Sequence, residues 1–126
     1  MAAGSGFSAA ERFEVDRAIR AAEQACRFEF SVFVGAAEDD PGVFAKRLHG
    51  TLVAPARSIL VMVDPAARSL EVVTGSEVHR HLTDRAVELA VLEMQSAFAA
   101  DEFVDGLTRG IAKLAEHARP QRTLHA

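Results

Sequence analysis

The run from Ile59 to Gly75, ILVMVDPAARSLEVVTG, constrains the fold of this chain more than any other segment. Its first five residues, Ile59–Val63, are apolar without a break, and a strand of that kind is covered on both faces of its sheet. After an Asp-Pro turn, apolar and polar residues alternate from Leu70 to Thr74, which is typical of a strand with a less completely covered face. The segment therefore predicts a central strand that turns into a more exposed antiparallel neighbour.

Helical and strand periodicities organise the rest of the chain. Phe28–Val34 alternates as a strand, and the apolar spacing before it predicts a helix over about residues 9–25. A short helix that begins at the Asp-Pro step of residues 40–41 separates this strand from Ile59–Val63. We therefore expect the two strands to be parallel, in a right-handed βαβ unit. Two helices follow the hairpin, with apolar stripes over Val87–Phe98 and Phe103–Leu114.

These elements predict an α/β fold, with a small mixed β-sheet (a parallel βαβ unit plus an antiparallel hairpin) packed by about four helices. The length of 126 residues fits one domain, which we place at residues 8–118, between a flexible N-terminus (1–7) and a flexible C-terminal tail (119–126). Gly106 and Gly110 lie on one face of the last helix, where we expect a notch for the close approach of another backbone.

Composition excludes several classes of function. The formal net charge is −4 and the Lys and Arg residues are scattered, so we expect no nucleic-acid partner. The one cysteine, Cys26, excludes an internal disulfide and ends an apolar stripe, as a small buried hydrophobe does. No window approaches the roughly 20 apolar residues of a membrane span and no secretory signal opens the chain, so we expect a cytoplasmic protein with no membrane partner. The motifs of nucleophile elbows, phosphate-binding loops and common zinc enzymes are missing, so we assign no catalytic residue.

Acidic residues are expected to gather where the two parallel strands end. Asp39 and Asp40 follow the first strand, and Asp64 ends the second. The third helix runs back towards the same edge of the sheet, so its end is expected to bring Asp101 and Asp105 there. Crowded carboxylates repel one another, and a hard cation with oxygen ligands relieves that repulsion.

The acidic rim formed by these five residues allows two interpretations. In the first it holds Ca²⁺ or Mg²⁺, a cofactor that the sequence does not make certain. In the second, Asp40 and Asp101 are helix caps, Asp64 is a turn residue, and the others form a solvated acidic surface.

A second group of polar residues is predicted at the opposite edge of the sheet. Gly75, His79, His81 and Asp84 follow the hairpin there, and the two imidazoles point the same way if the segment is extended. This arrangement suggests a small-ligand edge. The alternative is that both histidines are simply exposed to solvent.

Four stretches resemble the TPM domain, and in particular small cytoplasmic TPM-like proteins of actinobacterial type. Individually each stretch is a weak signal, and their order and spacing carry the resemblance. The stretches are FSVFVG at Phe30–Gly35, ILVMVDPAARSLEVVTG at Ile59–Gly75, HLTDRAVELAVLEM at His81–Met94, and FVDGLTRGIAKLA at Phe103–Ala115.

The resemblance implies three alternative roles. Plant relatives have been proposed to be acid phosphatases, some TPM domains are thought to bind a divalent cation through carboxylates, and others act as auxiliary modules. Asp64 and Asp84 stand on acidic positions of the pattern, and Gly75 stands on the glycine after the hairpin. We therefore expect a non-catalytic accessory module that binds an unknown protein partner or forms a homo-oligomer. The alternative is a divalent-metal-dependent phosphatase acting at the acidic rim.

Overall fold

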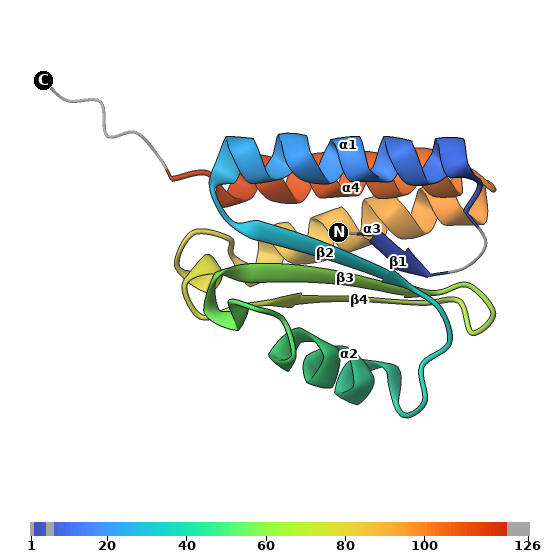
Figure 1. The fold of residues 1–126 in the computed structure, drawn as a ribbon, viewed down its shortest axis with the longest axis horizontal. Helices are drawn as coiled ribbons and strands as arrows, with labels where there is room; N and C mark the ends of the chain where they lie inside the picture. Colours follow the sequence, from blue (N-terminus) through green and yellow to red (C-terminus); the bar gives the residue numbers. More distant parts are fainter. Residues whose placement is uncertain (1, 5–6, 121–126) are drawn as a thin grey trace, which may run out of the picture.

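A computed structural model of the chain describes residues 2–4 and 7–120, which form three layers (Figure 1). A four-stranded sheet in the order β1-β2-β3-β4 lies between three helices on one face and one helix on the other. The strands are β1 (Ala2–Gly4), β2 (Glu29–Val34), β3 (Ser58–Asp64) and β4 (Ser69–Thr74).

The pairing of the strands confirms the predicted fold class. β2 is parallel to β3, with Phe30 opposite Ile59, and β3 is antiparallel to β4, with Val61 opposite Val72. The strand β1 is an addition, because residues 1–7 were expected to be flexible and residues 2–4 pair in parallel with β2. Most of the tail expected at residues 119–126 lies outside the described part of the chain.

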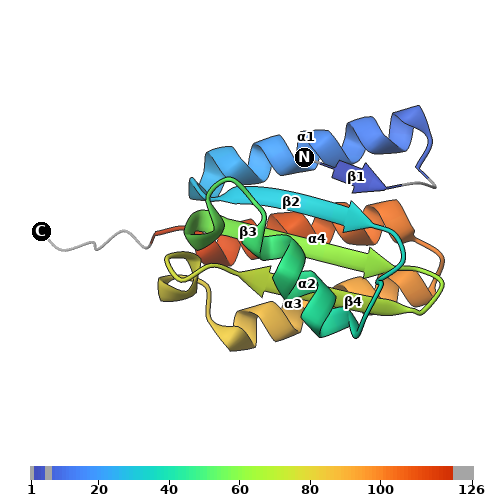
Figure 2. The same ribbon diagram turned by 60° about the horizontal axis from the view of Figure 1, so that its bottom comes forward.

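Helices α1, α3 and α4 cover one face of the sheet, and α2 covers the other, as the turned view shows (Figure 2). The connections from α2 to β3 and from β4 to α3 each contain a short 3₁₀ helix. The bounds are α1 (Ala9–Cys26), α2 (Pro41–Gly50), η1 (Pro55–Arg57), η2 (Val78–Arg80), α3 (Asp84–Ala99) and α4 (Phe103–Ala118). No described helix combines the length and the hydrophobicity that crossing a lipid bilayer requires.

Side-chain caps explain why three of the helices begin where they do. Ser8 and Glu11 form a reciprocal capping box at the start of α1. Asp40 accepts a hydrogen bond from the Val43 amide at the start of α2, and Thr83 accepts one from the Ala86 amide at the start of α3. These caps satisfy amides that have no partner within the helix.

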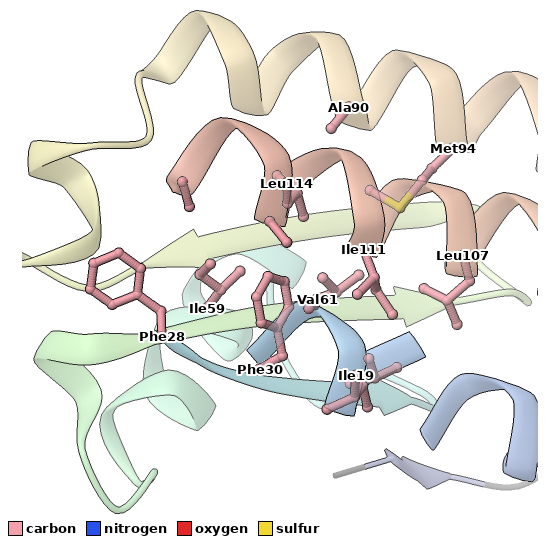
Figure 3. Packing of buried hydrophobic residues seen from close by; sticks show 14 of the residues in the cluster. Ile19, Phe28, Phe30, Ile59, Val61, Ala90, Met94, Leu107, Ile111 and Leu114 are labelled. Atoms are coloured by element: carbon pink, nitrogen blue, oxygen red, sulfur yellow. The ribbon is translucent and has the colours of Figure 1, made fainter. Parts of the chain in front are cut away.

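The strand β3 is buried along its whole length, as its unbroken apolar run predicts. On one face, Val61 packs in the main core with side chains from β2 and α4, among them Phe30 and Ile111 (Figure 3). On the other face, Leu60 and Met62 form a smaller core with Phe44 of α2. The main core is the larger because three helices contribute to it.

The glycines of α4 form the notch that the sequence predicts. A Cβ atom at Gly106 would lie 2.5 Å from the Cβ of Ala97, and one at Gly110 would overlap the side chain of Met94. Both neighbours belong to α3, so the two helices approach closely at the expense of side-chain volume on α4. The approach is made through side chains of α3 rather than through its backbone.

Candidate functional site

The carboxyl end of the sheet is arranged as the chain direction predicts. Because β2 and β3 are parallel, Gly35 and Asp64 lie at the same edge, and the Gly35 amide donates to the carbonyl oxygen of Val63. The β3–β4 hairpin, the α3–α4 connection and the start of α1 all meet at this end, on the right of Figure 1. This end therefore contains the residues predicted to form the acidic rim.

The side chain of Asp64 has a structural role at this end of the sheet. Its side chain accepts hydrogen bonds from the Ala37 amide at 3.0 Å and the Ala67 amide at 3.2 Å, and the residue is only 6% exposed. One carboxylate thus holds the loop after β2 against the hairpin after β3. Hydrogen bonds to a charged acceptor stabilise a fold by about 1.5–3 kcal/mol each, so the carboxylate has a sufficient structural role.

The other acids of the rim are also engaged or exposed singly. Asp39 forms an ion pair with Arg47 at 2.7 Å, and Asp105 forms one with Arg109 at 3.0 Å. Asp40 caps α2. Within residues 7–120, no three His, Cys, Asp or Glu side chains come together closely enough to hold a metal ion. Four of the five predicted ligands therefore contact amides or arginines of the protein, and the fifth, Asp101, is exposed in the α3–α4 connection.

A pocket of about 660 Å³ opens beside Asp64, on the face of the sheet that carries α1, α3 and α4. Val34, Val63 and Leu70 form its sheet side. The aromatic rings of Phe7, Phe98 and Phe103 line the opposite side. The ring centroids of Phe98 and Phe103 are 4.8 Å apart, and those of Phe7 and Phe103 are 5.6 Å apart.

Two exposed charged residues, contributed by different connections, line this pocket. Arg68 lies in the hairpin and Asp101 in the α3–α4 connection, and both line the pocket. Both have left-handed backbone conformations, with φ of 53° and 61° respectively. A side chain makes this conformation unfavourable, so the chain holds two charged residues where glycine would be easier to accommodate.

The opposite, amino end of the sheet is tightly connected. Arg57 forms an ion pair with Glu77 at 3.0 Å, donates to the carbonyl oxygen of Arg27 at 2.7 Å, and lies over the ring of Phe28. The buried imidazole of His49 donates to the carbonyl oxygen of Ser58 at 2.9 Å. These contacts join β2, β3 and both 3₁₀ segments.

The predicted ligand residues at this end have mainly structural neighbours. A Cβ atom at Gly75 would overlap the carbonyl oxygens of Pro55 and Ala56, so the glycine allows two backbone segments to touch. His79 and Asp84 lie 3.6 Å apart and both are exposed, and the ring of His81 contacts Phe28. His79 and His81 therefore have different neighbours within the protein.

Two potential nucleophiles, Ser69 and Cys26, are shielded from solvent. The Ser69 hydroxyl is shielded from water and has no hydrogen-bond partner among the described residues. Cys26 is 1% exposed, and burial raises the pKa of its thiol above the ordinary value, which favours the unreactive protonated form. The pocket at the carboxyl end is lined by apolar side chains together with the charged residues Asp64, Arg68 and Asp101.

Sequence reasoning did not identify the pocket. Its aromatic side comes from Phe98 and Phe103, which lie close together in the sequence, and from Phe7, which most of the chain separates from them. A partial signal existed, because Phe98 and Phe103 flank the polar break at residues 101–102. Two apolar residues beside a helix–helix connection are expected to lie close together, although Phe7 gave no such indication.

The fold and the site together define a class: a small three-layer α/β domain with an apolar pocket at the carboxyl end of its sheet. The chain belongs to the family described as "Domain of unknown function (DUF5130)", which matches residues 2–115. Two relatives from Mycobacterium tuberculosis are the uncharacterized protein Rv2468c of strain H37Rv and its counterpart MT2543 of strain CDC 1551. Each is 31% identical over 114 residues, which cover 90% of this chain and 68% of the relative.

Three solved structures are similar in fold. The BA42 protein from Bizionia argentinensis has a TM-score of 0.81 at 20% identity, over 90% of this chain and 82% of that chain. The N-terminal domain of cg2496 from Corynebacterium glutamicum gives 0.74 at 11% identity (99% and 87%). The N-terminal domain of a P. gingivalis protein gives 0.67 at 16% identity (92% and 83%).

The assignment to the TPM family is wrong, because the family that matches nearly the whole chain is DUF5130. The stretches on which the resemblance depended are the apolar strands, the hairpin and the helical stripes of a mixed sheet. Such patterns follow from a mixed sheet covered by helices and do not identify one family.

Proposed function

We propose that this domain is a non-catalytic accessory module that binds a protein partner or a second copy of itself by adding a strand to β4. The observation that carries the proposal is the position of β4 at the edge of the sheet, where no strand of the described chain pairs with its outer side. An exposed edge strand offers a row of unpaired amides and carbonyls to an extended segment of another chain.

The hydrogen-bond register identifies which groups face outward. The Gly75 amide donates to the carbonyl oxygen of Ser58 at 3.0 Å, so this pair is a hydrogen-bonded one. Such pairs alternate along an antiparallel ladder. Leu70, Val72 and Thr74 therefore direct their backbone groups away from β3, while the residues between them bond to it.

The state of the acidic residues supports the non-catalytic part of the proposal. Asp64 accepts from two amides, and Asp39 and Asp105 pair with arginines. The same contacts leave the alternative, a metal-dependent phosphatase, without a supporting observation. The proposal includes a cytoplasmic location, which suits a chain with a single unpaired cysteine.

The test compares two substitutions at the centre of the edge. Val72→Pro removes an outward N–H group and keeps the ladder to β3, whereas Val72→Ala removes side-chain volume and keeps the N–H group. We expect Val72→Ala to retain a bound partner or self-association and Val72→Pro to lose it. Light scattering over a range of protein concentrations measures self-association, and affinity capture followed by mass spectrometry measures other partners. Equal binding by both variants would contradict strand addition.

A separate measurement tests the absence of catalysis. The wild-type protein is incubated with 4-nitrophenyl phosphate at several pH values, with and without millimolar Ca²⁺ or Mg²⁺. We expect hydrolysis at the rate of the buffer alone. Metal-dependent turnover above that rate overturns the non-catalytic assignment, whatever the result at β4.

A further inference from the structure

The pocket beside Asp64 has the size and the lining of a small-molecule site. Its volume of about 660 Å³ lies within the range of roughly 300–1,000 Å³ that ligand pockets occupy. Phe7 lies just before α1, Phe98 at the end of α3 and Phe103 at the start of α4, and all three are only partly buried. Aromatic rings in mutual contact that also face a pocket favour a flat apolar ligand.

Arg68 is the positively charged residue that lines this pocket. Its guanidinium group is exposed and has no ion pair or hydrogen bond with any described residue, whereas Arg47, Arg57 and Arg109 are all paired. The nearby carboxylate of Asp64 is directed to two backbone amides. The guanidinium is therefore available to an anion, which it binds in a two-pronged geometry.

The two exposed charged residues of the pocket have strained backbone conformations. Arg68 and Asp101 are two of the three described non-glycine residues with positive φ, and the third, Arg27, lies at the far end of the sheet after α1. Glycine would relieve the local strain at all three positions. Because two of the three strained positions carry a charge at one pocket, their side chains are candidates for ligand recognition.

We propose that this pocket binds a small aromatic molecule with an anionic group, the ring lying against the three phenylalanines and the anion at Arg68. Asp101, which lines the same pocket, weakens the binding of a second negative charge, so the ligand class is a monoanion. The proposal does not depend on strand addition at β4.

The absence of Trp and Tyr from the chain makes a direct binding measurement simple, because indole fluorescence comes from the ligand alone. Three probes share the ring and differ in charge: indole-3-propionate (an anion), indole-3-propanol (neutral) and tryptamine (a cation). We expect the anion to bind at least about fivefold more tightly than the neutral probe at low salt, since a charge-assisted hydrogen bond adds about 1 kcal/mol or more. Added salt reduces this difference.

Three glycine substitutions remove a charge and relieve the backbone strain at the same time, so each is expected to fold. Arg68→Gly weakens binding of the anion by about fivefold and leaves the neutral probe unchanged. Asp101→Gly strengthens binding of the anion by about twofold. Arg27→Gly is the matched control, with the same backbone change and charge change at the far end of the sheet, and leaves all three affinities unchanged.

Several outcomes overturn the proposal. Equal binding of the anion and the neutral probe shows that Arg68 takes no part, and tightest binding of tryptamine shows that Asp101 governs recognition. Equal losses in Arg68→Gly and Arg27→Gly show a general effect of charge, and no binding of any probe at millimolar concentration shows that the pocket is not a site for this class. None of these results bears on partner binding at β4, which the Val72 variants test separately.

Discussion

The two ends of the sheet use polar groups in different ways. At the amino end, Arg57 contacts three partners and the imidazole of His49 donates to a backbone carbonyl. At the carboxyl end, Asp64 satisfies two amides, but Arg68 and Asp101 have no ion-pair partner among the described residues, and a pocket lies between them. The amino end is thus joined by several side-chain contacts, whereas the carboxyl end keeps two exposed charged residues beside an apolar pocket, and the binding proposal depends on that difference.

Gly75→Ala is expected to have the largest effect on stability, because it disrupts the tightly connected amino end of the sheet. The new methyl group overlaps two backbone carbonyl oxygens that have no freedom to rotate away. We expect a loss of at least about 3 kcal/mol in the free energy of unfolding, measured by urea denaturation. Gly50→Ala is the control, since no heavy atom lies within 4 Å of its added Cβ and helix propensity favours alanine. Similar losses in both variants would refute the close approach at residue 75.

Asp64→Ala tests the structural role of the one buried acid at the carboxyl end. The substitution leaves the Ala37 and Ala67 amides without their acceptor, and we expect a loss of about 2–3 kcal/mol in urea denaturation. Asp39→Ala removes an acid from an exposed ion pair in the same region, and its effect is expected to remain below about 1 kcal/mol. If both losses are small, Asp64 does not hold the two loops together.

The burial of Cys26 is expected to make the stability of the protein depend on pH. Its thiol has a raised pKa in the folded protein because of burial, so the folded state retains the proton more strongly than the unfolded state does. The resulting stability is complete below the thiol pKa of the unfolded chain, about 8.5, and is lost as pH rises through the folded pKa. We expect the free energy of unfolding to fall above that pH by up to about 1.4 kcal/mol per unit, and Cys26→Ala to remove this part of the slope. An identical slope in both proteins would show that the thiol is accessible.

The smallest effect on stability is expected for one residue with positive φ at each end of the sheet. Arg27→Gly and Arg68→Gly each relieve a positive φ, and we expect each to raise the free energy of unfolding by about 0.5–1 kcal/mol. Thermal unfolding followed by circular dichroism measures both. A loss of stability in Arg68→Gly alone would mean that its side chain supports the hairpin, which would change the interpretation of the binding experiment.

The sequence predicts most of the fold because local patterns determine it. The apolar run of Ile59–Val63 indicates a strand covered on both faces, and the Asp-Pro step at residues 40–41 indicates the start of α2, as the structure confirms. The strand β1 was missed because its sequence, Ala-Ala-Gly, has no alternation of apolar and polar residues.

The site was harder to predict because it depends on which group each side chain contacts. Chain direction brings Asp64 and Asp101 to one end of the sheet, where both border the pocket. No sequence pattern shows that Asp64 accepts a hydrogen bond from the Ala37 amide or that Asp39 forms an ion pair with Arg47. The pocket combines aromatic rings that are far apart in the sequence, and hydrophobic periodicity does not show which distant segments come together.

The hydrogen bond between Ala37 and Asp64 also has a consequence for the order of folding. It joins residues 27 positions apart, so it forms only after β2 has found β3, whereas the turns of α1 form from neighbouring residues. A side chain rather than a strand protects the Ala37 amide from exchange with deuterium. The exchange rate of that single amide therefore measures how often the two loops separate while the rest of the domain stays folded.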